Sequence, residues 1–217
     1  MCYSDDISMV AFLVNLVGSI ILLERCPALG IFMAFVGCMQ LFDYIFWKNP
    51  CENRVNYVTT KVAMLFNHLQ PFVLVLALFF VSAPHRPPFR PLTRILVLLY
   101  ATAVIPYTVL AWNNVEYTLV REKSRPGLQW DWNIQPGAKV VYAIFLCCLA
   151  AVALLEIPLF PLNVLFSFFV VLSFFVTIVL HKSVGTVGRF WCHYAAYSPL
   201  LLAAIAVVSG PVPGKKG

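Results

Sequence analysis

Long apolar stretches separated by short polar breaks run along the whole chain. The apolar residues follow one another without the strict alternation of polar and apolar positions that marks the strands of a membrane β-barrel. Each stretch is about long enough for a helix to cross a hydrocarbon layer of about 30 Å, which takes about 20 residues. The pattern predicts an all-α fold, a polytopic transmembrane helical bundle of about seven spans. The predicted spans are 7–23, 29–47, 58–81, 96–112, 140–155, 161–180 and 190–208.

Prolines mark several of the breaks between these spans. Asn49-Pro50 and the proline-rich segment 84–91 cannot continue a helix, because proline lacks the backbone N–H and clashes with the preceding turn. The weakest boundary is 156–158, between the fifth and sixth spans. Without it the number of spans falls to six.

The longest predicted loop is 113–139. It contains Trp130 and Trp132, and tryptophan favours the interface between membrane and water. No separate soluble domain is visible, so we expect a single transmembrane helical domain over 1–209 and a flexible C-terminal tail over 210–217.

Composition supports a membrane protein. Hydrophobic residues make up 61% of the 217 residues, and charged residues only 11%, against about 25% charged in soluble proteins. These values exclude a soluble globular domain, a disordered chain and a small disulfide-stabilised secreted domain. The net charge of +6 does not indicate nucleic-acid binding, since no basic patch interleaved with aromatic residues lies outside the spans. The expected partner is the lipid bilayer, and assembly into a homo-oligomer is left open.

The orientation of the chain depends on opposing signals. Seven spans would place nine of the 15 basic residues on the side of the N-terminus, which points to a cytoplasmic N-terminus. The N-terminal segment itself has no positive charge, and Cys2 and Cys51 would lie on one side, where an oxidising compartment allows a disulfide. On balance these features favour an N-terminus on the outer, non-cytoplasmic side of the membrane.

A few polar side chains fall inside the predicted spans. In the second span, Gln40 and Asp43 share one helix face, and in the third span Lys61 and His68 share another. The short connection between these spans makes an ion pair between Asp43 and Lys61 geometrically reasonable, with His68 about two turns deeper. Such a cluster suits a proton path or a ligand site. The alternative is an interfacial salt bridge with an extended Lys61.

A second polar group surrounds the proline of the third span. Pro71 removes the hydrogen bond to the carbonyl of Asn67, and Gln70 adds an amide beside it. Similar notches form binding sites in transporters, and they also occur as ordinary kinks stabilised by neighbouring helices.

The sequence shows no enzyme signature. No histidine pair with metal-ligand spacing, no nucleophile elbow and no phosphate-binding loop is present. A metal site formed by Cys2, Cys51, Cys192 and His193 matches no spacing typical of metal sites. We therefore predict no catalytic residue, metal or cofactor, and the sequence favours a protein that is not an enzyme. An intramembrane enzyme using the Cys2 thiol or a metal is the least favoured alternative.

Several short motifs carry a resemblance to known proteins. They are the opening Met1-Cys2-Tyr3-Ser4, then Met39-Gln40-Leu41-Phe42-Asp43, Phe46-Trp47, Cys51 and Asn67-His68-Leu69-Gln70-Pro71. This third of the chain resembles small multi-pass membrane proteins that begin Met-Cys-aromatic-Ser and occur in bacteria and large DNA viruses. The family is functionally uncharacterised, so the resemblance implies about seven spans and no activity. The resemblance implies that a carboxylate at the position of Asp43 is a shared feature of these proteins. It also gives more weight to Cys2 and Gln70 as candidate functional residues.

Two functions are consistent with these features. The first is an ion or small-solute pathway, or a ligand sensor, built on a polar intramembrane cluster. The second is a structural or assembly protein, for example of a viral or organelle membrane. The cluster that the first function would use comprises Gln40, Asp43, Lys61, His68 and Gln70.

Overall fold

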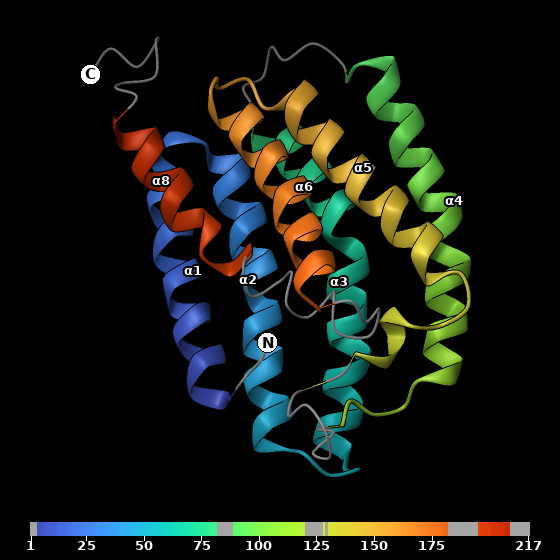
Figure 1. The fold of residues 1–217 in the computed structure, drawn as a ribbon. Helices are drawn as coiled ribbons and strands as arrows, with labels where there is room; N and C mark the ends of the chain where they lie inside the picture. Colours follow the sequence, from blue (N-terminus) through green and yellow to red (C-terminus); the bar gives the residue numbers. More distant parts are fainter. Residues whose placement is uncertain (1–3, 82–88, 120–127, 129, 182–194, 209–217) are drawn as a thin grey trace.

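The structure, a computed structural model, describes residues 4–81, 89–119, 128, 130–181 and 195–208. These residues form mainly α-helices, and they contain no β-strand. The predicted all-α helical bundle is confirmed (Figure 1). Its elements are α1 (Asp5–Arg25), α2 (Pro27–Lys48), α3 (Arg54–Val81), α4 (Pro91–Asn114), the 3₁₀ turn η1 (Asp131–Asn133), α5 (Ala138–Glu156), α6 (Leu162–His181) and α8 (Ser198–Val208).

Five of these helices, α1 to α5, are long and apolar enough to cross a membrane. The 21 residues of α1 span about 32 Å at a rise of about 1.5 Å per residue. The break at 156–158 is real, because α5 ends at Glu156 and α6 begins at Leu162. Helix α8 has only 11 residues, about 16 Å, which is half of a hydrocarbon layer. The structure thus supports five full spans, and the number seven stays a prediction.

Local sequence explains where the first helices begin and end. The Ser4 side chain accepts a hydrogen bond of 3.2 Å from the Ile7 backbone N–H and so caps α1. Cys26 alone separates α1 from α2, and Pro27 occupies the first turn of α2, where proline costs no hydrogen bond. The two helices therefore fold back on each other as a tight antiparallel hairpin (Figure 1).

Small residues allow α1 to contact its neighbours closely. A Cβ added at Gly18 would lie 2.4 Å from the backbone nitrogen of Leu200 in α8, and one at Gly37 would lie 2.2 Å from Oδ1 of Asn15. Close backbone approach through glycine is a common way to pack helices in membranes, where dispersion forces and hydrogen bonds replace the hydrophobic effect between helices.

The outer surface of the bundle is apolar, and its mainly hydrophobic interior also contains buried polar side chains. Large hydrophobic side chains such as Leu98 and Phe175 are more than half exposed, at 65% and 63%. Asn15, Asn67 and Thr177 are buried inside. This arrangement suits a lipid solvent, in which apolar side chains face outward and polar groups must find partners within the protein.

The described part of the loop before α5, around Trp130 and Trp132, is folded into the bundle. Trp130 and Trp132 are almost fully buried, at 1% and 0% exposure, and their rings stack with centroids 5.3 Å apart. The Tyr107 hydroxyl on α4 donates a hydrogen bond to the carbonyl of Trp132. Both rings therefore pack against protein, and the Trp132 backbone is bonded to α4. Their position relative to the membrane–water interface stays a prediction.

Some predicted features lie outside the described residues. They include Cys2, Cys192, His193 and the tail 210–217. Cys51 is exposed with a free thiol, and the disulfide to Cys2 stays a prediction. The orientation of the chain in a membrane also stays a prediction.

Candidate functional site

The five residues predicted to form one polar cluster are all buried, but they do not lie together. Their exposed fractions are between 0% and 5%. Each has a different set of neighbours, so the predicted cluster divides into separate environments, two residues lying on α2 and three on α3. The residues concerned are Gln40, Asp43, Lys61, His68 and Gln70.

Lys61 binds the C-terminal end of α4. Its Nζ donates to the carbonyl of Val115 at 2.7 Å and also to the carbonyl of Trp112. The ammonium group lies 5.2 Å from the ring centre of Tyr57 and 5.1 Å from that of Trp112. The last carbonyls of a helix have no partner within the helix and carry partial negative charge, so a cation there is stabilising. Lys61 is therefore a helix cap, and the ion pair expected with Asp43 is not formed.

Asp43 contacts the inserted loop. Its Oδ1 accepts a hydrogen bond of 3.0 Å from Nε1 of Trp130, and its side chain is fully buried. The carboxylate on α2 therefore holds the loop that follows α4, a segment 87 residues further along the chain. This contact gives Asp43 a clear structural role at the place where the loop enters the bundle.

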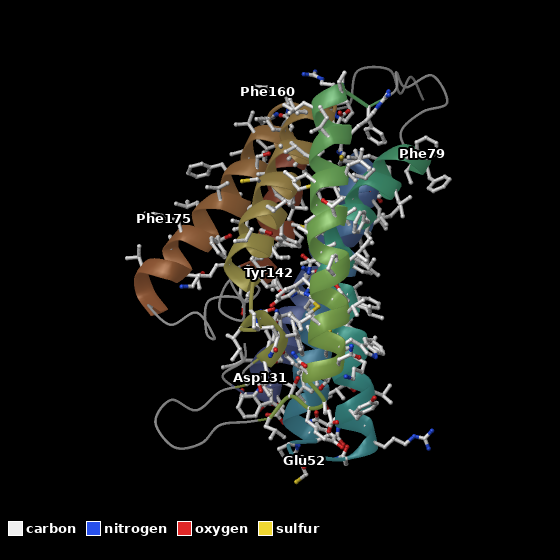
Figure 2. The ribbon with its side chains drawn as sticks, turned by 90° about the vertical axis from the view of Figure 1, so that its right-hand side faces the viewer. Glu52, Phe79, Asp131, Tyr142, Phe160 and Phe175 are labelled. Carbon is white, nitrogen blue, oxygen red and sulfur yellow. The ribbon has the colours of Figure 1, made fainter. Side chains whose placement is uncertain are left out.

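His68 lies at the centre of a buried hydrogen-bonded group between α3, α4 and α5. Its Nδ1 is 2.8 Å from Oγ1 of Thr108, and its Nε2 is 3.1 Å from the hydroxyl oxygen of Tyr142. Asn67 donates to that same hydroxyl oxygen at 2.9 Å, and the hydroxyl of Tyr142 donates to Oδ1 of Asn133 in η1. Figure 2 shows Tyr142 near the lower end of α5, with Asp131 below it. We call this group the His68 chain.

Counting hydrogens shows what the His68 chain can accommodate. Four contacts follow one another. The Thr108 hydroxyl contacts the Val104 carbonyl and Nδ1 of His68, and the Tyr142 hydroxyl contacts Nε2 of His68 and Oδ1 of Asn133. The two terminal groups, the Val104 carbonyl and Oδ1 of Asn133, can only accept a hydrogen bond. The hydrogens for all four contacts must therefore come from Thr108, His68 and Tyr142. The two hydroxyls and a neutral imidazole supply three hydrogens, whereas an imidazolium supplies the fourth. A neutral His68 therefore leaves one contact without a hydrogen, and its tautomer decides which one.

Gln70 faces a different part of the molecule. It is fully buried, and neither its amide nitrogen nor its amide oxygen has a hydrogen-bond partner among the described residues. It lines a cavity of about 40 Å³ together with Met33 of α2, Phe166 of α6 and Ser198 of α8. The expected polar notch is therefore divided, because Asn67 bonds to the His68 chain and Gln70 does not.

A neighbouring helix contributes a hydrogen bond to α3 close to Pro71. The hydroxyl of Tyr100 on α4 donates a 2.8 Å hydrogen bond to the carbonyl of His68, one turn before the proline. Gln40, the remaining member of the predicted cluster, is 1% exposed, and its Oε1 has no partner in the described part of the chain. It does not line the cavity beside Gln70.

The polar groups that sequence reasoning missed come from residues with weak individual signals. Thr108, Asn133 and Tyr142 complete the His68 chain. Glu156 at the end of α5 accepts a hydrogen bond of 3.0 Å from the Arg90 backbone N–H at the start of α4. Of these residues, only Thr108 lies well inside a predicted span, so only its position could have identified it from the sequence. Tyr142 and Glu156 lie at the ends of a predicted span, and Asn133 lies in a predicted loop.

No group of three potential metal ligands occurs among the described residues. The metal site considered from the sequence would use Cys2, Cys51, Cys192 and His193, and only Cys51 lies among the described residues. Comparison of the chain with protein-family models, curated proteins and solved structures gives no match. The resemblance to Met-Cys-aromatic-Ser membrane proteins stays a prediction, and the chemistry of the site has to be inferred from the residues of this chain.

Proposed function

We propose that this chain is a multi-pass membrane protein that takes up and releases a proton at His68, as an ion pathway or as a sensor. The observation that carries the proposal is the His68 chain, a row of hydrogen-bonded side chains that has one hydrogen too few when the imidazole is neutral. Histidine is the side chain whose charge changes most readily near neutral pH. One hydroxyl on each side of the ring, that of Thr108 and that of Tyr142, is placed to exchange a hydrogen with the imidazole.

The surroundings of His68 favour a proton over a larger ion. Tyr107 and Thr108 face the ring from α4, and Tyr142 faces it from α5, while Tyr100 of α4 binds its backbone carbonyl. No Asp, Glu, Lys or Arg among the described residues is hydrogen-bonded or ion-paired to it. Hydroxyl groups can pass hydrogens along without opening a space, whereas a hydrated metal ion needs a water-filled route.

Proton movement can be measured in liposomes that contain the purified protein and a pH-sensitive dye, with a potassium diffusion potential as the driving force. His68→Gln keeps hydrogen-bonding atoms at the site but cannot change its charge, so we expect the flux to disappear. Ser167→Ala is a matched control, because Ser167 is a buried hydroxyl that binds the Ala150 carbonyl outside the His68 chain. This variant should conduct like the parent protein.

Sensing without flux requires a second measurement. Nitrogen NMR of the labelled imidazole should show His68 changing its protonation state within the pH range in which the protein stays folded, and Tyr142→Phe should shift that transition. Absence of both a flux and a transition would rule out the pathway and the sensor together.

The second candidate is a structural or assembly membrane protein. Two observations favour it: Asp43 and Lys61 fasten the inserted loop and the end of α4, and the cavity beside Gln70 borders neither Asp43 nor His68. In that case Asp43→Asn lowers only the stability of the protein or its assembly, and the liposomes stay tight to protons.

A further inference from the structure

The cavity beside Gln70 offers a hydrogen-bonding group to a ligand. A buried amide without partners is costly, and in proteins such groups bind protein, water or ligand. The Gln70 side chain has two N–H hydrogens and an oxygen with two lone pairs, and none of these has a described partner. The side chain lines the cavity, so a molecule inside can satisfy both ends of the amide.

The cavity wall limits what that molecule can be. Most of the wall is hydrocarbon, with Phe32 and Val36 from α2, Leu149 from α5 and Phe166 from α6. No charged side chain among the described residues lines it, so an ion would enter without a counter-charge from them, at high cost in desolvation. The ligand is therefore neutral. A volume of about 40 Å³ accommodates a polar group of about three water-sized units.

The start of α8 adds a second polar contribution. Ser198, the first residue of α8, lines the cavity, and its hydroxyl donates to the Ala195 carbonyl at 2.7 Å. Its oxygen therefore keeps a lone pair for a donor. Gly18, which contacts this end of α8, lies about 20 Å along α1 from Asp5, counted at about 1.5 Å per residue. The start of α8 is accordingly at middle height in the bundle (Figure 1), and its dipole places partial positive charge beside the cavity.

We propose that the Gln70 cavity binds a small neutral molecule whose polar end both donates and accepts a hydrogen bond, such as a primary amide, an alcohol or an undissociated carboxylic acid. The Gln70 amide pairs with that end, which fills the volume of about 40 Å³, and any hydrocarbon remainder extends out through the open side of the cavity. Such a molecule comes either from water or from the bilayer, and the experiment below separates these sources.

This site is independent of the His68 chain. Two residues along an α-helix correspond to a turn of about 200°, so Gln70 and His68 lie on opposite faces of α3. Gln70 faces α2, α6 and α8, whereas His68 faces α4 and α5. Failure of proton uptake at His68 would leave the ligand site unaffected, and the reverse also holds.

Fluorine NMR with trifluorobutyramide tests the proposal on the full chain in lipid nanodiscs. We expect a saturable change in the probe signal. Gln70→Met keeps the side-chain length and removes the amide, and it should weaken binding by about tenfold or more, the effect of losing at least one hydrogen bond to a buried group. Gln40→Met is the matched control, because Gln40 is also buried with an unpartnered oxygen but does not line the cavity. It should leave binding unchanged.

Two further arms complete the test. Val36→Phe fills the cavity without touching the amide and should also abolish saturable binding, which covers the case in which Gln70→Met does not fold. Competition identifies the source of the ligand. Displacement of the probe by acetamide added to the water indicates a water-borne ligand, and displacement by oleamide dissolved in the bilayer indicates a lipid-borne ligand. If the folded parent protein gives no saturable signal, or if Gln70→Met binds like the parent, the cavity holds only water and the proposal is wrong.

Discussion

Replacing Asn56 by alanine should destabilise the protein strongly, although Asn56 is only the third residue of α3. Its Nδ2 donates to the carbonyls of Asn49 and Thr118, both at 2.8 Å. Its Oδ1 accepts from the Thr118 backbone N–H at 2.9 Å and from the Thr60 hydroxyl at 3.2 Å. One fully buried side chain therefore ties the connection after α2 and the segment after α4 to the start of α3.

The magnitude follows from these four contacts. Hydrogen bonds between side chains in membrane proteins average about 0.6 kcal/mol each, which gives about 2.4 kcal/mol for the set. Alanine also leaves the two carbonyls and the Thr118 N–H without partners, and an unsatisfied buried group costs about 1–3 kcal/mol. We therefore expect Asn56→Ala to lower the free energy of unfolding by about 2–4 kcal/mol, between the membrane average and the full cost for buried groups.

Denaturant titration in mixed micelles, followed by tryptophan fluorescence, measures this difference. Asn114→Ala is the control, because Asn114 is exposed and makes a single 3.3 Å contact with Gln135. Exposed positions of this kind usually change stability by less than about 0.5 kcal/mol. If both variants lost the same small amount, the assignment of Asn56 as the tie between three segments would be wrong.

Two other substitutions test the helix contacts. In Gly18→Val the new side chain would meet the backbone of Leu200, which cannot rotate away, so we expect a loss of about 1–3 kcal/mol from overpacking. The same titration measures it, with Val17→Ala at an exposed neighbouring position as the control, and equal stability of the two would contradict the contact between α1 and α8. Lys61→Met removes the cation from the end of α4 and leaves the Trp112 and Val115 carbonyls unpaired, so hydrogen exchange in the last turn of α4 should accelerate. Unchanged exchange there would refute the capping role.

The sequence predicts the helices well, because their signal is local. Runs of apolar residues and the prolines at 27 and 91 define helix boundaries without reference to the rest of the fold. The break between α5 and α6 also followed from a proline. Helix α8 covers Ser198–Val208 of the apolar run 190–208 that predicted it, and residues 190–194 of that run lie outside the described residues.

The site was harder to predict because its partners lie far apart in the chain. Burial of Asp43, Lys61 and His68 followed from their positions in apolar runs, but their partners did not. Lys61 bonds to carbonyls, which every residue possesses, so no residue type marks that contact. Trp130 was assigned to the membrane interface on its general preference, whereas its N–H found a buried carboxylate.

The buried loop has a consequence for the order in which the protein assembles. Residues 130–133 carry two indoles, an aspartate and an asparagine, and most of their backbone is not in a regular α-helix. Such a segment cannot stand alone in lipid, because its polar backbone groups would have no partners there. It therefore enters only after α2, α3 and α4 have come together to offer Asp43, Asn67 and Tyr107 as partners. Packing of residues 130–133 is thus a step separate from the formation of the helices, and it follows the association of α2, α3 and α4.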